Sequence, residues 1–263
     1  MESRRVIYDE YGQTGNRFFS YIDSVGWAII NKKKCIILFP EDILKYYDNF
    51  RNSPYIKLPL WGWREKFVWK IARKLLYYNS VIQLFYKTSL AKRMGFYSGW
   101  TLRSSMDYYP NVKQEVFRIF TPNKNITEPI DELFASERKL GKLIIGVHIR
   151  KGDYKNYMGG KYYFDDSVFM RYMDSVKSLK PNCVFFVASN ESVSSLFAQQ
   201  YPILPNPVNN VSGDMYALSQ CDYIMGPPST FSGWALLVGN VPLYYIKNKS
   251  SSIVLEDFKP MRG

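Results

Sequence analysis

In the second half of the chain, short hydrophobic runs alternate with amphipathic stretches. The apolar runs have the length of buried strands and the stretches between them have helical spacing. The expected strands are 143–149, 184–188, 223–225 and 243–246, and the expected helices are 165–179, 191–200, 215–220 and 231–238. Strands that alternate with helices predict a parallel sheet with right-handed crossovers.

The first half begins with the same alternation. Residues 4–8 can form a short strand, a glycine loop leads into a helical pattern over 17–30, and 35–39 form the next apolar run. The segment 122–137 is polar and punctuated by prolines, which is typical of a linker. We therefore expect two Rossmann-like α/β domains, residues 1–135 and 136–263, with the boundary near residue 135.

The run 143–149 reads as the central strand, because it is apolar enough to be buried on both faces. His148, Arg150, Lys151 and Asp153 lie at or just past its carboxyl end, where open α/β sheets bind ligands. The fork of Arg150 suits a phosphate, and Lys151 adds a point charge. The alternative is a strand end whose polar residues are merely solvated, although His148 is the only histidine in the chain.

Two more polar loops are expected at the same edge. Ser189 and Asn190 follow the second strand, and Ser229, Thr230 and Phe231 follow the third. Ser229 and Thr230 open a helix, whose dipole favours a phosphate, although simple capping of the helix explains them equally. The loop of Gly12, Gly15 and Asn16 precedes another helix, where it can cradle phosphate or sugar or serve as a tight turn.

Composition narrows the class of protein. The 263 residues carry 46% hydrophobic positions, which is enough for real cores and argues against disorder. Three widely spaced cysteines indicate neither a disulfide framework nor a zinc site and fit a reducing compartment. Neither a secretory signal nor a run of 18 apolar residues occurs, so we expect a cytoplasmic protein that is soluble or peripheral.

The formal charge of +12 is concentrated in the middle of the chain. Residues 51–103 hold 11 basic residues, one acid and 12 aromatic residues. Within this basic region (about 61–103), residues 61–93 predict a basic amphipathic helix for an anionic membrane surface. An ordinary solvated helix is the alternative, and no nucleic-acid signature supports an RNA or DNA partner. The basic face would hold Lys66, Lys70, Arg73 and Lys74, the apolar face Phe67, Ile71, Ala72 and Leu75, and the interfacial rings Trp61, Trp63, Trp69, Tyr77, Tyr78 and Tyr86.

Three motifs in the same order resemble those of the fucosyltransferase superfamily. The segment 148–154, His-Ile-Arg-Lys-Gly-Asp-Tyr, resembles the His-x-Arg-Arg-x-Asp signature of the α1,2-, α1,6- and protein O-fucosyltransferases. The segment 214–234 is similar to their Asp, Leu-Ser-x-Cys and Ser-Ser/Thr-Phe-Ser region, and 12–21 resembles the opening of the α1,2 branch. Lys151 and the pair Pro227 and Pro228 depart from the usual pattern and leave the linkage open.

The resemblance implies a GT-B-like fold with the donor, GDP-fucose, in the C-terminal domain. His148 and Asp214 match residues that contact guanine, Arg150 matches the residue that binds the β-phosphate, and Ser229, Thr230 and Phe231 match residues around the phosphates and base. A carboxylate such as that of Asp214 can accept two guanine hydrogens and would reject adenine. The resemblance also implies inversion at the sugar C1 and a glycan as acceptor.

The chemistry requires charge on the departing diphosphate to be neutralised, which suits Arg150. No Asp-x-Asp motif occurs, so transfer without a metal or other cofactor is expected. The α1,6 enzymes carry a carboxylate where this chain has Met158, which leaves Asp153 as the nearest candidate base; a role in holding Arg150 is the alternative. A non-catalytic nucleotide- or phosphosugar-binding module, or a transferase for another GDP-sugar, is the competing interpretation.

Overall fold

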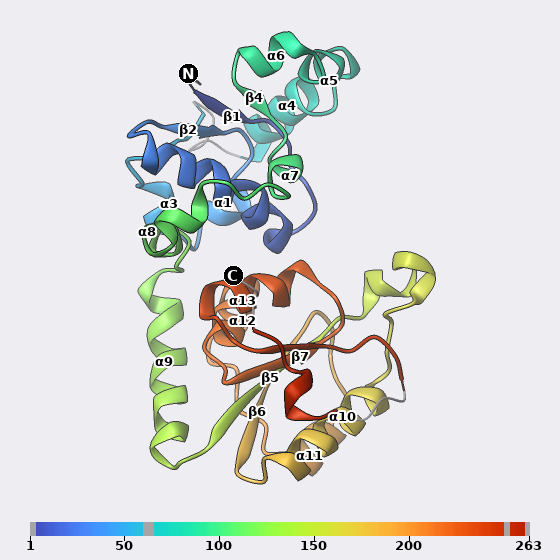
Figure 1. Cartoon of the computed structure of the whole chain (residues 1–263). Coiled ribbons are helices and arrows are strands. Elements are labelled where there is room, and N and C mark those ends of the chain that lie inside the picture. The colour runs from blue at the N-terminus through green and yellow to red at the C-terminus, as the bar shows by residue number, and fades with distance from the viewer. Residues whose placement is uncertain (1–3, 60–65, 250–252, 261–263) are drawn as a thin grey trace. The chain divides into compact units, whose positions relative to one another are not determined.

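The computed structural model describes residues 4–59, 66–249 and 253–260 (Figure 1). The chain divides into two compact units, Met1–Asn123 and Lys124–Gly263, each built around a four-stranded sheet in which every pairing between named strands is parallel. The division precedes the expected boundary near residue 135, which falls inside the first helix of the second unit.

The first unit orders its strands β3-β2-β1-β4. Its strands are two or three residues long, and β1 is paired on both sides, with Ile7 opposite Ile37 and Tyr97. The elements are β1 (Arg5–Ile7), α1 (Thr14–Ile30), β2 (Cys35–Ile37), α2 (Glu41–Leu44), α3 (Asp48–Arg51), β3 (Ile56–Lys57), α4 (Lys66–Leu76), α5 (Ser80–Tyr86), α6 (Ser89–Arg93), β4 (Phe96–Tyr97), α7 (Gly99–Leu102), a 3-10 turn (Tyr109–Val112) and α8 (Lys113–Ile119).

Helix α4 closes one side of this sheet. Trp69 and Ala72 pack with Val6, Leu38 and Phe39 in one buried cluster. The long helix α1 is almost wholly buried and packs against α7, α8 and the 3-10 turn. The hydrophobic core of the first unit therefore lies on both faces of a very short sheet.

The second unit orders its strands β6-β5-β7-β8, with β5 in the centre as the sequence predicts. Strands β5 and β6 are paired in register over seven residues, from Leu143 opposite Cys183 to Ile149 opposite Ser189. The elements are α9 (Lys124–Lys139), β5 (Leu143–Ile149), 3-10 turns at Gly152–Lys155 and Tyr157–Gly160, α10 (Asp166–Leu179), β6 (Cys183–Ser189), α11 (Leu196–Gln200), α12 (Val211–Ser219), β7 (Tyr223–Gly226), α13 (Thr230–Gly239), β8 (Leu243–Tyr245) and a 3-10 turn at Leu255–Asp257.

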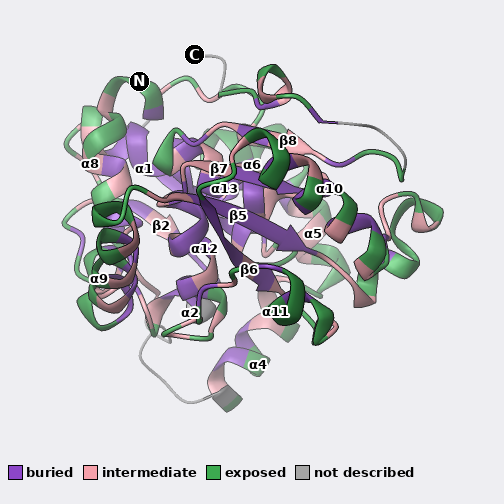
Figure 2. Ribbon diagram, turned by 90° about the horizontal axis from the view of Figure 1, so that it is seen from below, coloured by how far each residue is buried: buried purple, intermediate pink, exposed green. Residues whose placement is uncertain are grey.

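Side chains of β5 alternate between two helical layers. Ile145, Val147 and Ile149 join the core formed with α10 and α11, whereas Gly146 lies under α12. A Cβ at Gly146 would lie 2.6 Å from a Leu218 methyl carbon, so only glycine allows α12 to approach this closely. Figure 2 shows β5 and β6 as largely buried ribbons, as expected for strands covered on both faces.

The expected linker over 122–137 is wrong. Residues 124–139 form α9, because Ile126, Ile130 and Phe134 recur at helical spacing and are buried, and Phe134 contacts Phe186 of β6 edge-on. Pro129 lies inside this helix. The apolar spacing therefore outweighed the proline and the polar composition.

The single helix expected over 61–93 is also wrong. The described part of this segment forms α4, α5 and α6, and residues 61–65 lie outside the described residues. Asn79 caps α5 by accepting hydrogen bonds from Val81 and Ile82, and Thr88 caps α6 by accepting one from Ala91. Each of these two polar residues begins a new helix shortly after the preceding one has ended.

Candidate functional site

His148 is the penultimate residue of the central strand and is buried. Only 3% of the residue is exposed, and its ring packs on Phe231 with 5.0 Å between the ring centroids. Burial, helped by the charge of Arg150, lowers the pKa of His148 to about 3, so the imidazole is neutral. Among the described residues its Nδ1 atom has no hydrogen-bond partner. A neutral ring with an unsatisfied nitrogen suits a ligand that completes the bond.

Arg150 is held by its own loop. Its Nη2 atom donates to Asp153 Oδ2 at 2.9 Å, and its guanidinium lies 5.7 Å from the centroid of the Tyr154 ring. The Tyr154 hydroxyl donates to the carbonyl of Pro228 at 2.7 Å, which ties the loop after β5 to the loop after β7. Tyr154 is the last residue of the motif segment 148–154 and was not among the predicted site residues. Burial raises the pKa of its hydroxyl.

The loop after β6 meets the same turn. The Lys151 amide donates to Asn190 Oδ1 at 2.8 Å, and the Ser189 hydroxyl donates to the Glu191 carbonyl at 2.7 Å. Gly152 has a φ of +53°, and a Cβ there would lie 2.7 Å from Glu191 Oε1. The Lys151 ammonium lies 2.5 Å from Asp166 Oδ1. Lys151, which was expected to add a positive charge for the ligand, therefore forms an ion pair within the protein.

Ser229 is the N-cap of α13. Its hydroxyl accepts from the Phe231 amide at 3.1 Å, and Thr230 is the first residue of the helix. The capping interpretation of this motif is therefore correct for Ser229. The same turn also carries Phe231, which covers His148, so it remains part of the candidate site.

Asp214 lies in the first turn of α12, on the side of the sheet where Gly146 meets this helix. Its Oδ1 atom accepts from Asn206 Nδ2 at 2.6 Å. Burial raises the pKa of Asp214 to about 6, and the bond from Asn206 lowers it again only in part. A half-titrated carboxylate near pH 6 is unusual for aspartate and marks a candidate binding group.

The predicted glycine loop belongs to the first unit. Gly12 has a φ of +62°, and a Cβ there would lie 2.1 Å from Asn16 Nδ2, so the Asn16 side chain folds over this glycine. Gly15 is buried in the first turn of α1. The loop is thus a tight turn whose shape depends on Gly12.

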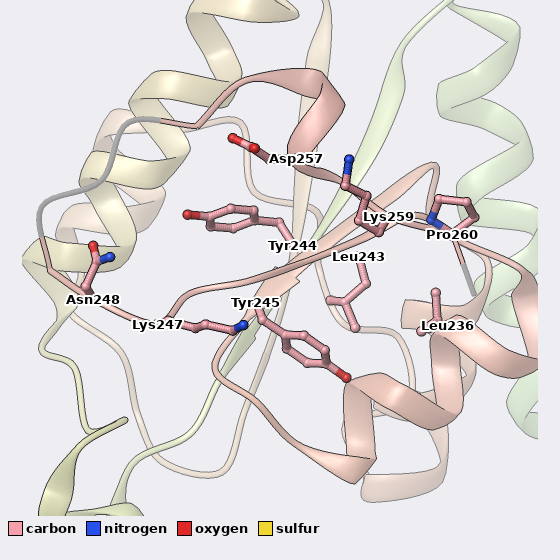
Figure 3. A pocket seen from close by; sticks show the side chains of 9 residues that line it. All are labelled: Leu236, Leu243, Tyr244, Tyr245, Lys247, Asn248, Asp257, Lys259 and Pro260. Carbon is pink, nitrogen blue, oxygen red and sulfur yellow. The ribbon is translucent and has the colours of Figure 1, made fainter. Parts of the chain in front are cut away.

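A separate pocket of about 460 Å³ lies beside the edge strand β8 (Figure 3). Figure 3 shows Tyr244 and Tyr245 on opposite sides of the strand, with Lys247 following them. None of the predicted site residues lines this pocket. In the described part of the chain, no group of three or more His, Cys, Asp or Glu side chains is placed to hold a metal ion.

The loops after β5, β6 and β7 thus converge as the sequence predicts, and the family model for glycosyl transferase family 11 matches residues 85–256. The chain belongs to this family. Its membership confirms the fucosyltransferase superfamily predicted from the motifs. The matched region includes His148, Arg150, Asp214 and Ser229 and excludes the glycine loop of the first unit.

No curated protein matches the chain. Among solved structures, it is similar to the fucosyltransferase NodZ from Bradyrhizobium, with 15% identity, a TM-score of 0.57 and coverage of 93% of this chain and 96% of that one. A NodZ α-1,6-fucosyltransferase soaked with GDP-fucose gives 16% identity, a TM-score of 0.56 and coverage of 98% and 97%. A mutant of FUT1 from Arabidopsis thaliana in complex with GDP gives 14% identity, a TM-score of 0.55 and coverage of 94% of this chain and 72% of that one.

These structures confirm the GT-B-like α/β fold that the resemblance implies for this glycosyltransferase. Within the described residues, no helix has both the length and the apolar character needed to cross a bilayer. Cys35, Cys183 and Cys221 are buried free thiols.

Proposed function

We propose that this family 11 enzyme transfers fucose from GDP-fucose to a hydroxyl of a glycan, with inversion at C1 and without a metal. The observation that carries the proposal is the pairing of a buried, neutral His148 with the Arg150 cation at the carboxyl end of β5. NodZ structures obtained with GDP and after soaking with GDP-fucose support the choice of donor.

Asp214 and His148 recognise the guanine base through hydrogen bonds. An ionised Asp214 accepts the N1 and N2 hydrogens of guanine, and His148 Nδ1, which has no partner in the part of the chain that the structure describes, completes a further bond. Adenine would leave these buried groups unsatisfied, which costs about 1–3 kcal/mol for each group. Ser229, Thr230 and Phe231 line the phosphates and the base, with Phe231 also fixing the plane of the His148 ring.

Arg150 acts on the leaving group. As the bond between fucose C1 and the β-phosphate oxygen breaks, the electron pair stays on that oxygen, and the guanidinium neutralises the growing charge. The acceptor hydroxyl forms the new bond to C1 and gives its proton to a base. Asp153 is the nearest candidate, and its 2.9 Å contact supports a second role in orienting Arg150.

Ser189 and Asn190 are proposed to shape the donor site of the second unit. Asn190 holds the Lys151 amide, which fixes the turn that carries Arg150. We assign the linkage to the α1,2 type because residues 12–21 resemble that branch. The proposed setting is surface polysaccharide or glycan synthesis at the cytoplasmic face of the inner membrane, on an acceptor that can be lipid-linked.

The proposal is tested by incubating the full chain with GDP-fucose and glycan acceptors, and measuring GDP release and fucosylated product with and without EDTA. We expect transfer that EDTA leaves unchanged. Loss of transfer in EDTA that added Mg²⁺ or Mn²⁺ restores would overturn the metal-independent mechanism. Equal or faster turnover of GDP-mannose would overturn the choice of sugar.

A further inference from the structure

Helix α4 carries two separate apolar stripes. Trp69, Ala72 and Leu76 recur at helical spacing and pack into the first unit, where Trp69 is only 5% exposed. Phe67, Ile71 and Leu75 recur at the same spacing on another face, and Phe67 and Leu75 are 68% and 57% exposed. A helix that is held by one apolar stripe normally presents polar residues elsewhere, so the second stripe requires an explanation.

The exposed apolar surface continues beyond α4. Helices α4 and α5 contact each other, as do α5 and α6, and Figure 1 shows the three helices grouped within the first unit. Val81 is 69% exposed and Leu90 is 58% exposed. We call this set the α4–α6 apolar surface; its members are Phe67, Ile71, Leu75, Tyr78, Val81, Leu84, Leu90 and Met94.

This surface accounts for eight of the 17 large hydrophobic side chains that are exposed among the described residues. Single exposed apolar residues are ordinary, but a concentration of them in 28 consecutive positions, 67–94, marks an interaction surface.

The charge around it has one sign. The exposed side chains of Lys70, Lys74, Lys87, Lys92 and Arg93 lie in the same segment, and residues 66–103 contain no aspartate or glutamate. Within the described part of the chain, none of these five cations takes part in an ion pair. The segment therefore combines exposed apolar side chains with uncompensated positive charge.

We propose that the α4–α6 apolar surface docks on an anionic lipid bilayer, with α4 lying in the plane of the interface. The 11 residues of α4 extend about 16 Å, which suits an interfacial helix and is too short to span a bilayer. The apolar side chains enter the boundary between headgroups and acyl chains, and the five cations reach the anionic headgroups. Anionic lipid is chosen over a protein because the exposed cations belong to the same three helices as the apolar residues, and residues 66–103 include no acid that could pair with a cationic partner.

The residues that dock differ from those expected from the sequence. Trp69 and Tyr86 are buried, and Arg73 binds Glu10, so these three belong to the fold of the unit. Trp61 and Trp63 lie outside the described residues. Val81, Leu84, Leu90 and Met94 take their place, and only Tyr78 of the expected described rings is exposed.

The experiment is flotation of the full chain with vesicles of neutral phosphatidylcholine or of phosphatidylcholine mixed with phosphatidylglycerol. We expect flotation with the anionic vesicles only, and release at roughly 0.5 M salt, where the Debye length is about 4 Å. The variants Phe67→Asp with Leu75→Asp, and Lys70→Glu with Lys74→Glu, should each reduce the bound fraction at least about tenfold.

Matched controls make the same changes elsewhere on the surface. Leu140→Asp with Leu179→Asp replaces two exposed leucines of the second unit, and Lys34→Glu with Lys139→Glu removes the same charge. Both control pairs should float like the parent protein. Equal loss in test and control pairs, flotation with neutral vesicles alone, or no flotation would overturn the proposal. A parent dimer that Phe67→Asp with Leu75→Asp dissociates would show that a second copy occupies the surface instead.

The docking proposal rests on the proposed function only in that both place the enzyme at a membrane. Transfer to a soluble acceptor should be unchanged in the α4 variants, since none of these residues belongs to the donor site. Flotation without transfer would therefore overturn the proposed chemistry, and transfer without flotation would overturn the docking surface.

Discussion

The carboxyl ends of β1 and β5 occupy equivalent places in the two sheets, and both carry charged side chains. After β1, Asp9 accepts from the amides of Gly99 and Trp100, and Glu10 binds Arg17 and Arg73. Near the end of β5, His148 is buried, and its Nδ1 atom has no hydrogen-bond partner among the described residues.

The difference separates the proposed ligand-binding edge of the sheet, at the end of β5, from the edge after β1, which we call the structural edge. The two carboxylates after β1 are satisfied by the protein and fix α7, α1 and α4 to the sheet. After β5, the neighbouring groups hold the loop in shape, and we propose that the buried Nδ1 atom of His148 binds the ligand. Both strand ends are polar, so polarity alone does not indicate a binding site. A buried polar atom that lacks a hydrogen-bond partner is the better indication.

Arg150→Lys should produce the largest effect. An ammonium cannot reproduce the bidentate contact of a guanidinium with a diphosphate, so we expect fucosyl transfer to fall roughly 100- to 1,000-fold with the fold intact. Arg118→Lys, at an exposed pair with Glu115, is the control and should retain activity. A rate for Arg150→Lys within a few fold of the parent rate would show that another cation neutralises the charge on the leaving diphosphate.

Glu10→Gln tests the structural edge. Removing this charge takes the paired carboxylate away from the buried Arg17 guanidinium, which should lower the free energy of unfolding by about 3 kcal/mol. The melting temperature should fall by roughly 5–10 °C, while GDP affinity stays unchanged. Glu115→Gln removes an exposed partner instead and should cost less than about 1 kcal/mol. A loss of GDP affinity in Glu10→Gln would contradict the claim that the edge after β1 has only a structural role.

Asp214→Asn should weaken GDP binding about 30-fold, since two bonds to an ionised carboxylate are lost. The parent protein should also bind GDP more tightly as pH rises through about 6, because guanine needs the ionised form of Asp214. The raised pKa means that the folded protein without ligand keeps this proton longer than the unfolded chain. The stability that Asp214 contributes is therefore present at low pH and is lost as pH rises through about 6.

Calorimetric titration with GDP between pH 5 and 8 measures this dependence, and Asp214→Asn should abolish it. His148 has a pKa of about 3 and does not titrate in this range. An unchanged pH dependence in Asp214→Asn would assign it to another group.

The sequence predicted the second unit better than the first. The apolar run of β5 and the polar residues after three strands were enough to predict the sheet and the convergence of three loops at its carboxyl edge. Strands β3 and β4 are two residues long and have no periodic signal of their own, so they were not predicted.

Long-range contacts account for the other misses. Lys151 binds Asp166, and Glu10 binds Arg73 from 63 positions away, and no local pattern indicates either partner. The two apolar stripes of α4 were visible as hydrophobic residues, but only the packing of Trp69 and Ala72 shows which stripe is buried. Within the motif segment 148–154, the contact between Arg150 and Asp153 is local. The role of Tyr154 depends on Pro228, which is 74 positions away, and it was missed for the same reason.

The central claim is that the edge after β5 binds a guanine nucleotide. Thermal unfolding of the full chain at pH 7.5 with equal concentrations of GDP, UDP, ADP or single-stranded DNA tests it most directly. We predict that GDP raises the melting temperature by several degrees, and that the other three raise it by less than about 1 °C. Equal shifts with GDP, UDP and ADP, or a shift with DNA alone, would contradict the claim.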